Sequence, residues 1–370
     1  MSQEEKSGKH RSKFKWINWT VIVISIIAAI VYIIAVDRPE NIVAAICSIR
    51  IHWLVAAAMM IVLYWLLESL VLHVVTKKLH PSQKFFNSLR TTMVGQFYNC
   101  VTPFASGGQP MQAYSMVKSG VPLGIAGSSL LVRFVIYQFA LTVYSLVALV
   151  IFWGFFTSEV AGMAFLSIIG FTVNSVVMAG LLCIVFARKF AKRFAVWGIR
   201  LLGKLRLVKR VEERIIETEA ELDRFYAGVQ LVRKNVFVLV RMFIYSILQL
   251  TAFFLIPYFL CLAFGQSGVS PFEVVAAQAF VTMISSFVPS PGAAGGAEIS
   301  FVTFFTIFMQ GSNLNLSMLL WRMLTFYAPL LVGGIVSLSC SNESEAYELN
   351  RLEMEEYKKK VMESNRADSE

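Results

Sequence analysis

The sequence predicts an all-α membrane protein that crosses the bilayer several times. Hydrophobic residues make up 57% of the 370 residues, charged residues only 15%, and the mean hydropathy is +0.65, as is typical of integral membrane proteins. Six apolar runs are long enough for a hydrocarbon layer that requires roughly 20 helical residues. They are residues 17–36, 53–75, 126–156, 163–187, 236–264 and 316–338. Regions 85–120 and 272–310 are apolar but interrupted, so we expect about eight membrane helices.

The first apolar run is predicted to remain as a span. It follows a basic tail, residues 1–16, and this arrangement resembles a secretory signal. A signal core has about 7–15 apolar residues and ends at a small-residue cleavage site, whereas run 17–36 is longer and leads into Asp37, Arg38 and Pro39. We therefore interpret it as an uncleaved span and expect the membrane domain to cover residues 17–338.

Basic residues predict the orientation, because lysine and arginine accumulate in cytoplasmic loops. The tail 1–16 is basic, segment 77–90 contains four basic residues and no acid, and segment 188–214 contains ten basic residues against two glutamates. The charged tail 339–370 contains a run of three lysines. We therefore expect these segments and both termini in the cytoplasm.

This orientation requires each interrupted region to enter and leave the membrane on one side. Two spans already connect segments 77–90 and 188–214, so region 85–120 must return to the cytoplasm, and region 272–310 must in the same way return to the outside. Residues 85–101 include too many polar side chains for a helix that faces lipid. We therefore expect two broken, re-entrant helical hairpins that enter from opposite faces.

Each interrupted region contains the spacing P-x-x-x-G-G, and we name these stretches the first elbow, residues 103–108, and the second elbow, residues 291–296. The repeated residues are Pro103, Gly107 and Gly108, and Pro291, Gly295 and Gly296. Two such copies are typical of an inverted repeat whose broken helices turn N–H groups towards an anion. The alternative is that proline and glycine simply end two helices at loops. We favour a substrate-binding site, with Asn99, Gln109 and Glu298 as neighbouring candidates, although Glu298 also suits a helix N-terminus.

Charged side chains inside apolar runs are costly and are candidates for function. Arg133 follows the first elbow, and its guanidinium is suited to hold a phosphate through two hydrogen bonds; the alternative is a structural ion pair with Glu68. Arg241 and Arg322 lie near the ends of their runs, where snorkelling to the surface is the simpler explanation. A counter-ion or phosphate-release role is the alternative for Arg322.

Segment 188–232 is predicted to be the main cytoplasmic element. In its first part apolar residues recur every three to four positions among basic ones, which indicates an amphipathic helix on the inner leaflet that attracts anionic lipids. A plain topology anchor is the alternative. Its second part, from Glu212 to Asp223, is acidic and is interpreted as a solvated helix face.

No motif points to a cofactor, a metal or a catalytic residue. Four histidines form no metal-binding spacing, five cysteines are scattered through apolar regions, and the stretch SGGQP lacks the lysine of a nucleotide-binding loop. The net charge of +10 follows from the membrane topology, so no nucleic-acid partner is expected.

Three stretches resemble the membrane region of the lysylphosphatidylglycerol synthase/flippase family and its stand-alone flippase-like relatives. They are GQFYNCVTPFASGGQP at 95–110, AGSSLLVRFVIYQ at 126–138 and SSFVPSPGAAGGAE at 285–298. The resemblance implies movement of a phospholipid, such as lysylphosphatidylglycerol, phosphatidylglycerol or a related lipid-linked headgroup, from the inner to the outer leaflet of a bacterial cytoplasmic membrane. It also implies a contribution to resistance against cationic antimicrobial peptides.

Two features depart from that family. Gln109 and Gln112 stand where relatives often have an acid and a base, and the tail 339–370 is too short for the soluble transferase domain of full-length synthases. We therefore do not expect this chain alone to be a phosphatidylglycerol lysyltransferase. The alternative function is a membrane subunit that acts with a separate transferase partner, and a channel or scaffold is the third class. Self-association is left open.

Overall fold

The computed structural model describes residues 47–159, 168–180 apart from Gly170 and Val173, 188–204, 211–286 and 288–339. Every regular element in these ranges is a helix, and no strand occurs among them. The predicted first span, 17–36, and the tails 1–16 and 340–370 lie outside the described residues, and run 163–187 is described only in part.

Four helical stretches in the described ranges are long and apolar enough to cross a membrane. They are Ile51–Leu79, Leu123–Phe152, Val236–Ala263 and Gly311–Leu338. These stretches confirm four of the predicted spans, and the chain is a membrane protein with several spanning helices. The first is helix α3 (Ile51–Leu79), and the second lies within α6 (Leu123–Glu159). Helix α3 packs against the third stretch and against α6.

The third and fourth stretches are interrupted inside the bundle. The third consists of α10 (Val236–Phe254) and α11 (Ile256–Ala263), with Pro257 in the first turn of α11, where the missing N–H of proline costs no helical hydrogen bond. The fourth consists of α14 (Gly311–Arg322), the π-helical turn η3 (Met323–Tyr327) and α15 (Ala328–Ser339).

The interrupted regions form two helical hairpins. The first consists of α4 (Phe85–Val101), the turn η1 (Pro103–Ala105) and α5 (Gly108–Lys118). The second consists of α12 (Pro271–Ser285), η2 (Pro291–Ala293) and α13 (Gly296–Phe305). In each hairpin the two helices pack together, and the longest of the four has 17 residues, fewer than a full crossing requires.

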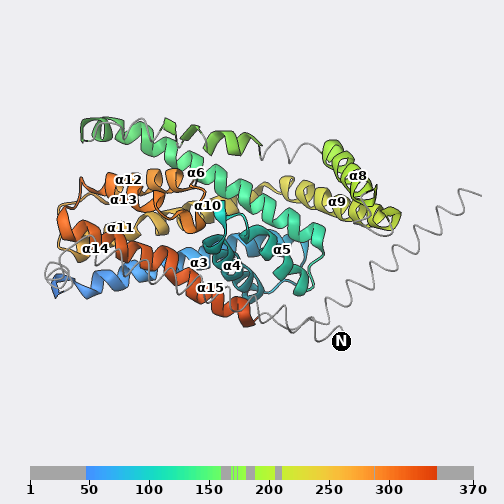
Figure 1. Ribbon diagram of the computed structural model, residues 1–370, viewed down its shortest axis with the longest axis horizontal. Helices are drawn as coiled ribbons and strands as arrows, with labels where there is room; N and C mark the ends of the chain where they lie inside the picture. Colours follow the sequence, from blue (N-terminus) through green and yellow to red (C-terminus); the bar gives the residue numbers. More distant parts are fainter. Residues whose placement is uncertain are drawn as a thin grey trace, which may run out of the picture.

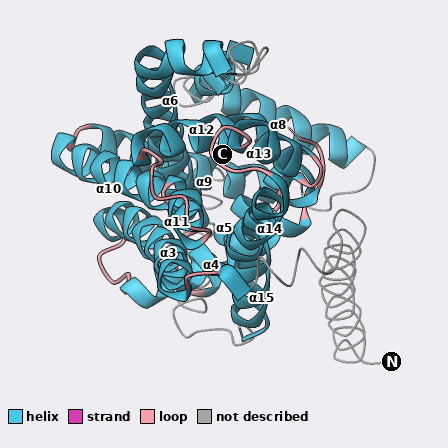
Figure 2. Ribbon diagram, turned by 90° about the vertical axis from the view of Figure 1, so that its left-hand side faces the viewer, coloured by secondary structure: helices cyan, strands magenta, loops and turns pink. Residues whose placement is uncertain are grey.

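The two hairpins follow one another along the bundle, and their turns meet. In Figure 1, α12 and α13 lie at the left, α4 near the centre and α5 to the right of α4. The turns η1 and η2 contact each other, and α4 also contacts η2. Seen end-on, the membrane helices stand side by side around these hairpins (Figure 2).

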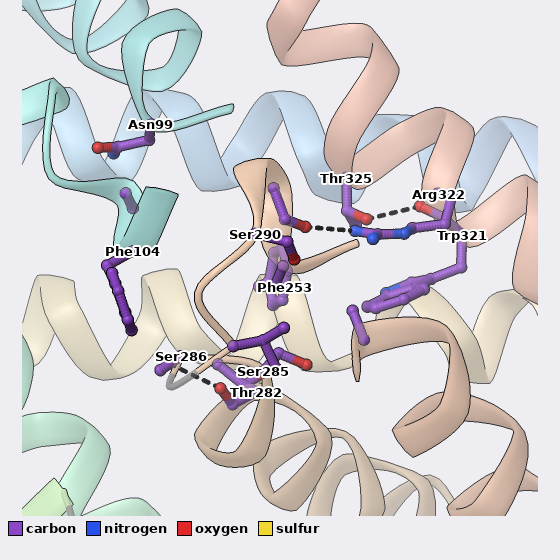
Figure 3. A pocket seen from close by; sticks show the side chains of 15 residues that line it. Asn99, Phe104, Phe253, Thr282, Ser285, Ser286, Ser290, Trp321, Arg322 and Thr325 are labelled. Carbon is purple, nitrogen blue, oxygen red and sulfur yellow. Dashed lines mark hydrogen bonds between the residues drawn. The ribbon is translucent and has the colours of Figure 1, made fainter. Parts of the chain in front are cut away.

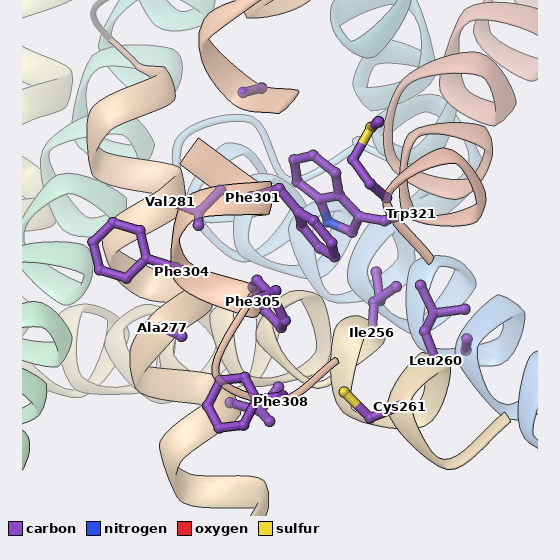
Figure 4. Packing of buried hydrophobic residues seen from close by; sticks show 14 of the residues in the cluster. Ile256, Leu260, Cys261, Ala277, Val281, Phe301, Phe304, Phe305, Phe308 and Trp321 are labelled. Atoms are coloured by element: carbon purple, nitrogen blue, oxygen red, sulfur yellow. The ribbon is translucent and has the colours of Figure 1, made fainter. Parts of the chain in front are cut away.

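Aromatic side chains of α13 form the centre of the largest buried cluster (Figure 4). The ring of Phe301 stacks on Phe305 at 4.2 Å between centroids and on Trp321 at 4.8 Å, while Phe304 stacks on Phe280 at 5.9 Å. Stacked pairs of this kind add about 0.5–1.5 kcal/mol to the burial of their area. The cluster therefore fixes the second hairpin against α14, the helix that ends at Arg322.

Segment 188–232, which was predicted to be cytoplasmic, forms two helices, α8 (Arg188–Lys204) and α9 (Val211–Arg233). Helix α9 packs along α6 and buries Ile215 and Val229, and the predicted solvated face is wrong for Glu221. The carboxylate of Glu221 accepts a hydrogen bond of 2.5 Å from the N–H of Gly124, in the first turn of α6. Glu221 was expected to face water. Its carboxylate instead binds one of the N–H groups at the start of α6 that have no partner within that helix.

Candidate functional site

Two cavities lie where the elbows meet the fourth spanning stretch. The first has a volume of about 220 Å³ and the second about 190 Å³. Both are lined by Asn99, Phe253, Gly292, Arg322 and Thr325, so the two cavities adjoin at these side chains. Figure 3 shows Asn99 and Phe104 on one side of the first cavity and Trp321 and Arg322 on the other.

The two elbows have the same backbone conformation at the positions that follow their prolines. Phe104 has φ 54° and ψ 21°, and the matching Gly292 has φ 60° and ψ 20°. The next residues, Ala105 and Ala293, are also left-handed, with φ of 51° and 55°. A left-handed conformation costs an L residue about 1–2 kcal/mol. Because this strained conformation occurs at both elbows, we interpret it as part of the functional site. All four residues line the first cavity.

Close approach of neighbouring side chains explains three of the four paired glycines, and the fourth, Gly295, has a left-handed φ of 88°. A Cβ atom at Gly108 would clash with the side chain of Asn99, and one at Gly107 would lie 2.6 Å from the methyl carbon of Thr102. A Cβ at Gly296 would clash with Val288. The glycines therefore allow the second helix of each hairpin to begin directly beside the end of the first.

The prediction that the elbows offer unpaired N–H groups to an anion is wrong for two of these groups. The N–H of Gly107 donates to the hydroxyl of Thr102 at 2.9 Å, and the N–H of Gly295 donates to Glu298 Oε2 at 2.7 Å. Side chains of the hairpins themselves thus satisfy the helix starts, as capping residues do elsewhere. The positive charge at the elbows comes instead from a side chain of the fourth stretch.

Arg322 supplies that charge. Its Nε donates to Glu298 Oε1 at 2.6 Å, and its Nη1 donates to the carbonyl oxygen of Gly292 at 3.0 Å. The side chain is 8% exposed, and its guanidinium carbon lies 5.6 Å and 5.2 Å from the ring centroids of Trp321 and Phe326. Snorkelling is therefore the wrong explanation for Arg322. The second elbow holds the guanidinium inside the protein, because it offers a carboxylate and a carbonyl oxygen there.

The π-helical turn η3 begins directly after Arg322. Such turns are rare and often occur at functional sites. Thr325, within this turn, lines both cavities, and its hydroxyl donates to the carbonyl oxygen of Trp321 at 2.7 Å. Phe326 lies where a Cβ of Gly292 would clash with it. The turn therefore brings both the hydroxyl and the aromatic ring against the second elbow.

Five hydroxyl side chains line the first cavity, and each donates its proton to a backbone carbonyl oxygen. They are Thr282, Ser285, Ser286, Ser290 and Thr325, with donor–acceptor distances of 2.6–2.9 Å. A hydroxyl that donates in this way keeps its oxygen lone pairs as acceptors. The lining thus combines acceptor oxygens from these residues with N–H donors from Arg322.

Arg133 lies in a different polar group. Its Nη1 forms an ion pair with Glu68 Oε1 at 2.7 Å, and its Nη2 donates to the side chain of Gln112 at 3.1 Å. The other oxygen of Glu68 accepts from Gln96 at 2.6 Å, and Gln96 lines the second cavity. Arg133 lines neither cavity, so the structure contains the ion pair that was its alternative explanation, and its role in substrate binding stays a prediction.

The remaining candidates lie around the site. Asn99 lines both cavities, whereas Gln109 and the two elbow prolines line neither. Arg241 is exposed near the start of α10, and its Nε donates to the hydroxyl of Tyr245 at 3.1 Å, as expected for a snorkelling residue. The sequence reasoning missed the serines and threonines at the end of α12. A cluster of hydroxyl residues just before the second elbow was the available signal. In the described part of the chain no three His, Cys, Asp or Glu side chains group as metal ligands.

The chain has clear relatives. A model of the family described as "Lysylphosphatidylglycerol synthase TM region" matches residues 19–333. A protein of Archaeoglobus fulgidus named "UPF0104 membrane protein" is 24% identical over 257 residues, which cover 68% of this chain and 75% of that protein. The family match covers the spans, both hairpins and both cavities. The chain therefore belongs to the family of the lysylphosphatidylglycerol synthase transmembrane region.

Proposed function

We propose that the protein is a lipid translocase that moves a phospholipid between the leaflets of a bacterial cytoplasmic membrane, with the headgroup bound in the two cavities. The observation that carries the proposal is Arg322, a buried arginine that lines both cavities where the two elbows meet. An ionisable residue inside a membrane domain is costly and is by default a candidate for a functional site. Family membership supports phosphatidylglycerol and its lysyl ester as substrates.

The chemistry of the lining supports a headgroup with both kinds of hydrogen-bonding group. Arg322 binds a phosphate through the N–H groups that Glu298 and Gly292 do not use, and guanidinium is well suited to planar, two-point contacts with phosphate oxygens. The hydroxyl oxygens of α12 and η3 then accept hydrogen bonds from hydroxyl or ammonium groups of the same headgroup. Phosphatidylglycerol, its lysyl ester and phosphatidylethanolamine carry such donors, and phosphatidylcholine does not.

The arrangement of the hairpins supports alternating access. We infer that the two hairpins are the halves of an inverted repeat that enter the membrane from opposite faces, and that rocking of one half against the other exposes the cavities to each leaflet in turn. Outward movement of a lysylated lipid would lower the negative charge of the outer surface, which is the physical basis of the proposed resistance to cationic peptides.

Leaflet exchange in proteoliposomes tests the proposal. Fluorescent lipids with native headgroups are incorporated, and an impermeant reductant reports how fast inner-leaflet probe reaches the outside. Wild type is expected to exchange phosphatidylglycerol and phosphatidylethanolamine faster than phosphatidylcholine. The variant Arg322→Gln/Glu298→Gln removes the ion pair without leaving a lone buried charge. It should lower exchange about 10- to 100-fold, the loss of one hydrogen bond to a charged group.

Arg241→Gln is the matched control, because it removes an exposed arginine that lines neither cavity. The proposal fails if the Arg322/Glu298 variant and this control exchange lipid equally well. Failure of wild type to exchange any of the lipids would favour the alternative of a membrane subunit with a separate transferase partner.

A further inference from the structure

Helix α8 presents an exposed apolar strip towards solvent. Phe194, Trp197 and Leu201 are 61%, 58% and 42% exposed, although such large apolar side chains are normally buried in a soluble surface helix. The rings of Phe194 and Trp197 lie 5.7 Å apart between centroids. At about 100° of rotation per residue these three positions fall within an arc of about 60°, so they form one continuous strip.

Positive charge borders this strip. Arg193 and Arg200 are exposed, and by the same rotation they lie directly beside Trp197 on the helix surface. The 17 residues of α8 contain six lysines and arginines and no acid. An apolar strip of aromatic and leucine side chains beside an arginine-rich face is the pattern of helices that lie in the interface of a membrane.

The opposite face of α8 is tied to the rest of the protein. Lys192 forms an ion pair of 2.7 Å with Asp223 of α9, and the partly buried Ala195 and Ile199 share that side of the helix. Helix α9 in turn packs along α6. The tie to α9 fixes the rotation of α8, so the strip faces away from the bundle.

The position of α8 matches the cytoplasmic surface of the membrane. Helices α8 and α9 lie at the right-hand end of the bundle in Figure 1. A Cβ at Gly228 of α9 would lie 3.4 Å from Leu79, the last residue of α3, so the basic last turn of α3 with Lys77 and Lys78 lies beside α9. The excess of lysine and arginine at this end places it on the cytoplasmic side.

We propose that α8 binds the anionic surface of the cytoplasmic leaflet, with Phe194, Trp197 and Leu201 inserted among the lipids and Arg193 and Arg200 at the phosphate groups. Anionic lipids are the occupant that fits, because the strip is apolar, arginines border it on one side and α8 lies at the end of the bundle where lysine and arginine accumulate. Each arginine at such a surface shifts the balance between bound and unbound helix about fivefold. The proposal concerns a membrane contact outside the cavities and does not depend on lipid translocation.

Quenching of Trp197 fluorescence tests this contact in the full-length protein. The protein is reconstituted into nanodiscs that contain brominated lipids, and the signal of Trp197 is taken as the difference between wild type and Trp197→Phe. We expect strong quenching when about a third of the lipid is anionic and weaker quenching in phosphatidylcholine alone. The variant Arg193→Gln/Arg200→Gln should remove most of that difference between the two lipid compositions.

Arg214→Gln/Arg233→Gln is the matched control, because it removes two exposed basic residues from α9 and leaves α8 intact. It should retain the response to anionic lipid. The proposal is overturned if Trp197 is quenched by aqueous iodide and not by brominated lipid, which would indicate a surface open to water or to a protein partner. It is also overturned if quenching by lipid is the same with and without anionic headgroups.

Discussion

Two arginines inside the described bundle each contact a carboxylate and the second helix of a hairpin. Arg133 follows Pro103 by 30 residues and donates to Gln112 of α5, and Arg322 follows Pro291 by 31 residues and donates to Glu298 of α13. Each elbow is thus followed, at nearly the same distance along the chain, by an arginine that contacts its hairpin. Only Arg322 lines the cavities, because Glu68 of α3 holds Arg133 to the side.

Removal of one partner from the buried pair of Arg133 and Glu68 should be strongly destabilising. Both side chains are almost fully buried, and loss of one partner leaves an uncompensated charge, which costs about 3–5 kcal/mol. We expect Glu68→Gln to lower the free energy of unfolding by this amount in detergent micelles, measured by denaturant titration. The double variant Glu68→Gln/Arg133→Gln should recover most of the loss.

Glu217→Gln provides the comparison for that experiment. Glu217 pairs with Arg214 on the surface of α9, where removal of a partner costs about 0–1 kcal/mol. Equal effects of the two single substitutions would contradict the assignment of Glu68 and Arg133 to a buried pair.

At the scale of single residues the sequence predicted the position of both elbows, but it did not predict that Arg322 is buried between them. Proline and glycine act through local backbone geometry, so Pro103, Pro291 and the glycine pairs located both turns. Arg322 stands near the end of an apolar run, and whether such a side chain turns to water or inwards depends on distant atoms. Here these atoms are Glu298 and the carbonyl of Gly292, which only the packed second hairpin brings within reach.

The elbows are elements under conformational strain, and glycine relieves it at only one of the two matching positions. Gly292→Ala should lower the stability of the protein. The left-handed conformation costs alanine about 1–2 kcal/mol, and its Cβ also clashes with Phe326. Gly311 has a similar φ of 58°, and no atom lies within 4 Å of the position that a Cβ would take there. Gly311→Ala should therefore have only the cost of the left-handed conformation, without a clash. Thermal unfolding in detergent should show the larger loss for Gly292→Ala, and equal losses would contradict the contact with Phe326.

The attachment of α9 to α6 gives a prediction for a whole element. A Cβ at Gly124 would clash with the backbone carbonyl oxygen of Glu221, so Gly124→Ala should separate α9 from α6. We expect faster hydrogen exchange of the α9 amides and faster proteolysis of the cytoplasmic segment. Gly198→Ala is the control, because no atom lies within 4 Å of its Cβ position and alanine favours the helix by about 0.5–1 kcal/mol. Unchanged exchange in Gly124→Ala would show that the close approach can relax without separation.

At the scale of elements the sequence predicted what hydropathy and helix breakers encode. Four spans and both broken hairpins have the predicted places, because length and apolar character alone decide them. The packing of α9 was not predicted. A run of acidic residues such as Glu221 predicts side chains exposed to solvent. Only the tertiary structure shows that this carboxylate caps the start of α6.

For the molecule as a whole, the parity of the spans and the charge of the loops predicted that the two hairpins enter the membrane from opposite faces, and this stays a prediction. The structure shows that their turns, η1 and η2, contact each other. Neither sequence periodicity nor loop charge could predict where a cavity remains, because the cavities are space left between side chains of many helices and of both elbow turns.

The size of these cavities has a consequence for the acyl chains of any lipid whose headgroup binds in them. Pockets that enclose a whole drug-sized molecule measure about 300–1,000 Å³, whereas the two cavities measure about 220 and 190 Å³. There is no room in them for a pair of acyl tails, which must stay in the hydrocarbon while the polar end passes through the protein. The exchange rate should then depend on headgroup chemistry and hardly on tail length, as a series of phosphatidylglycerols with 12, 16 and ~20 carbon chains would reveal.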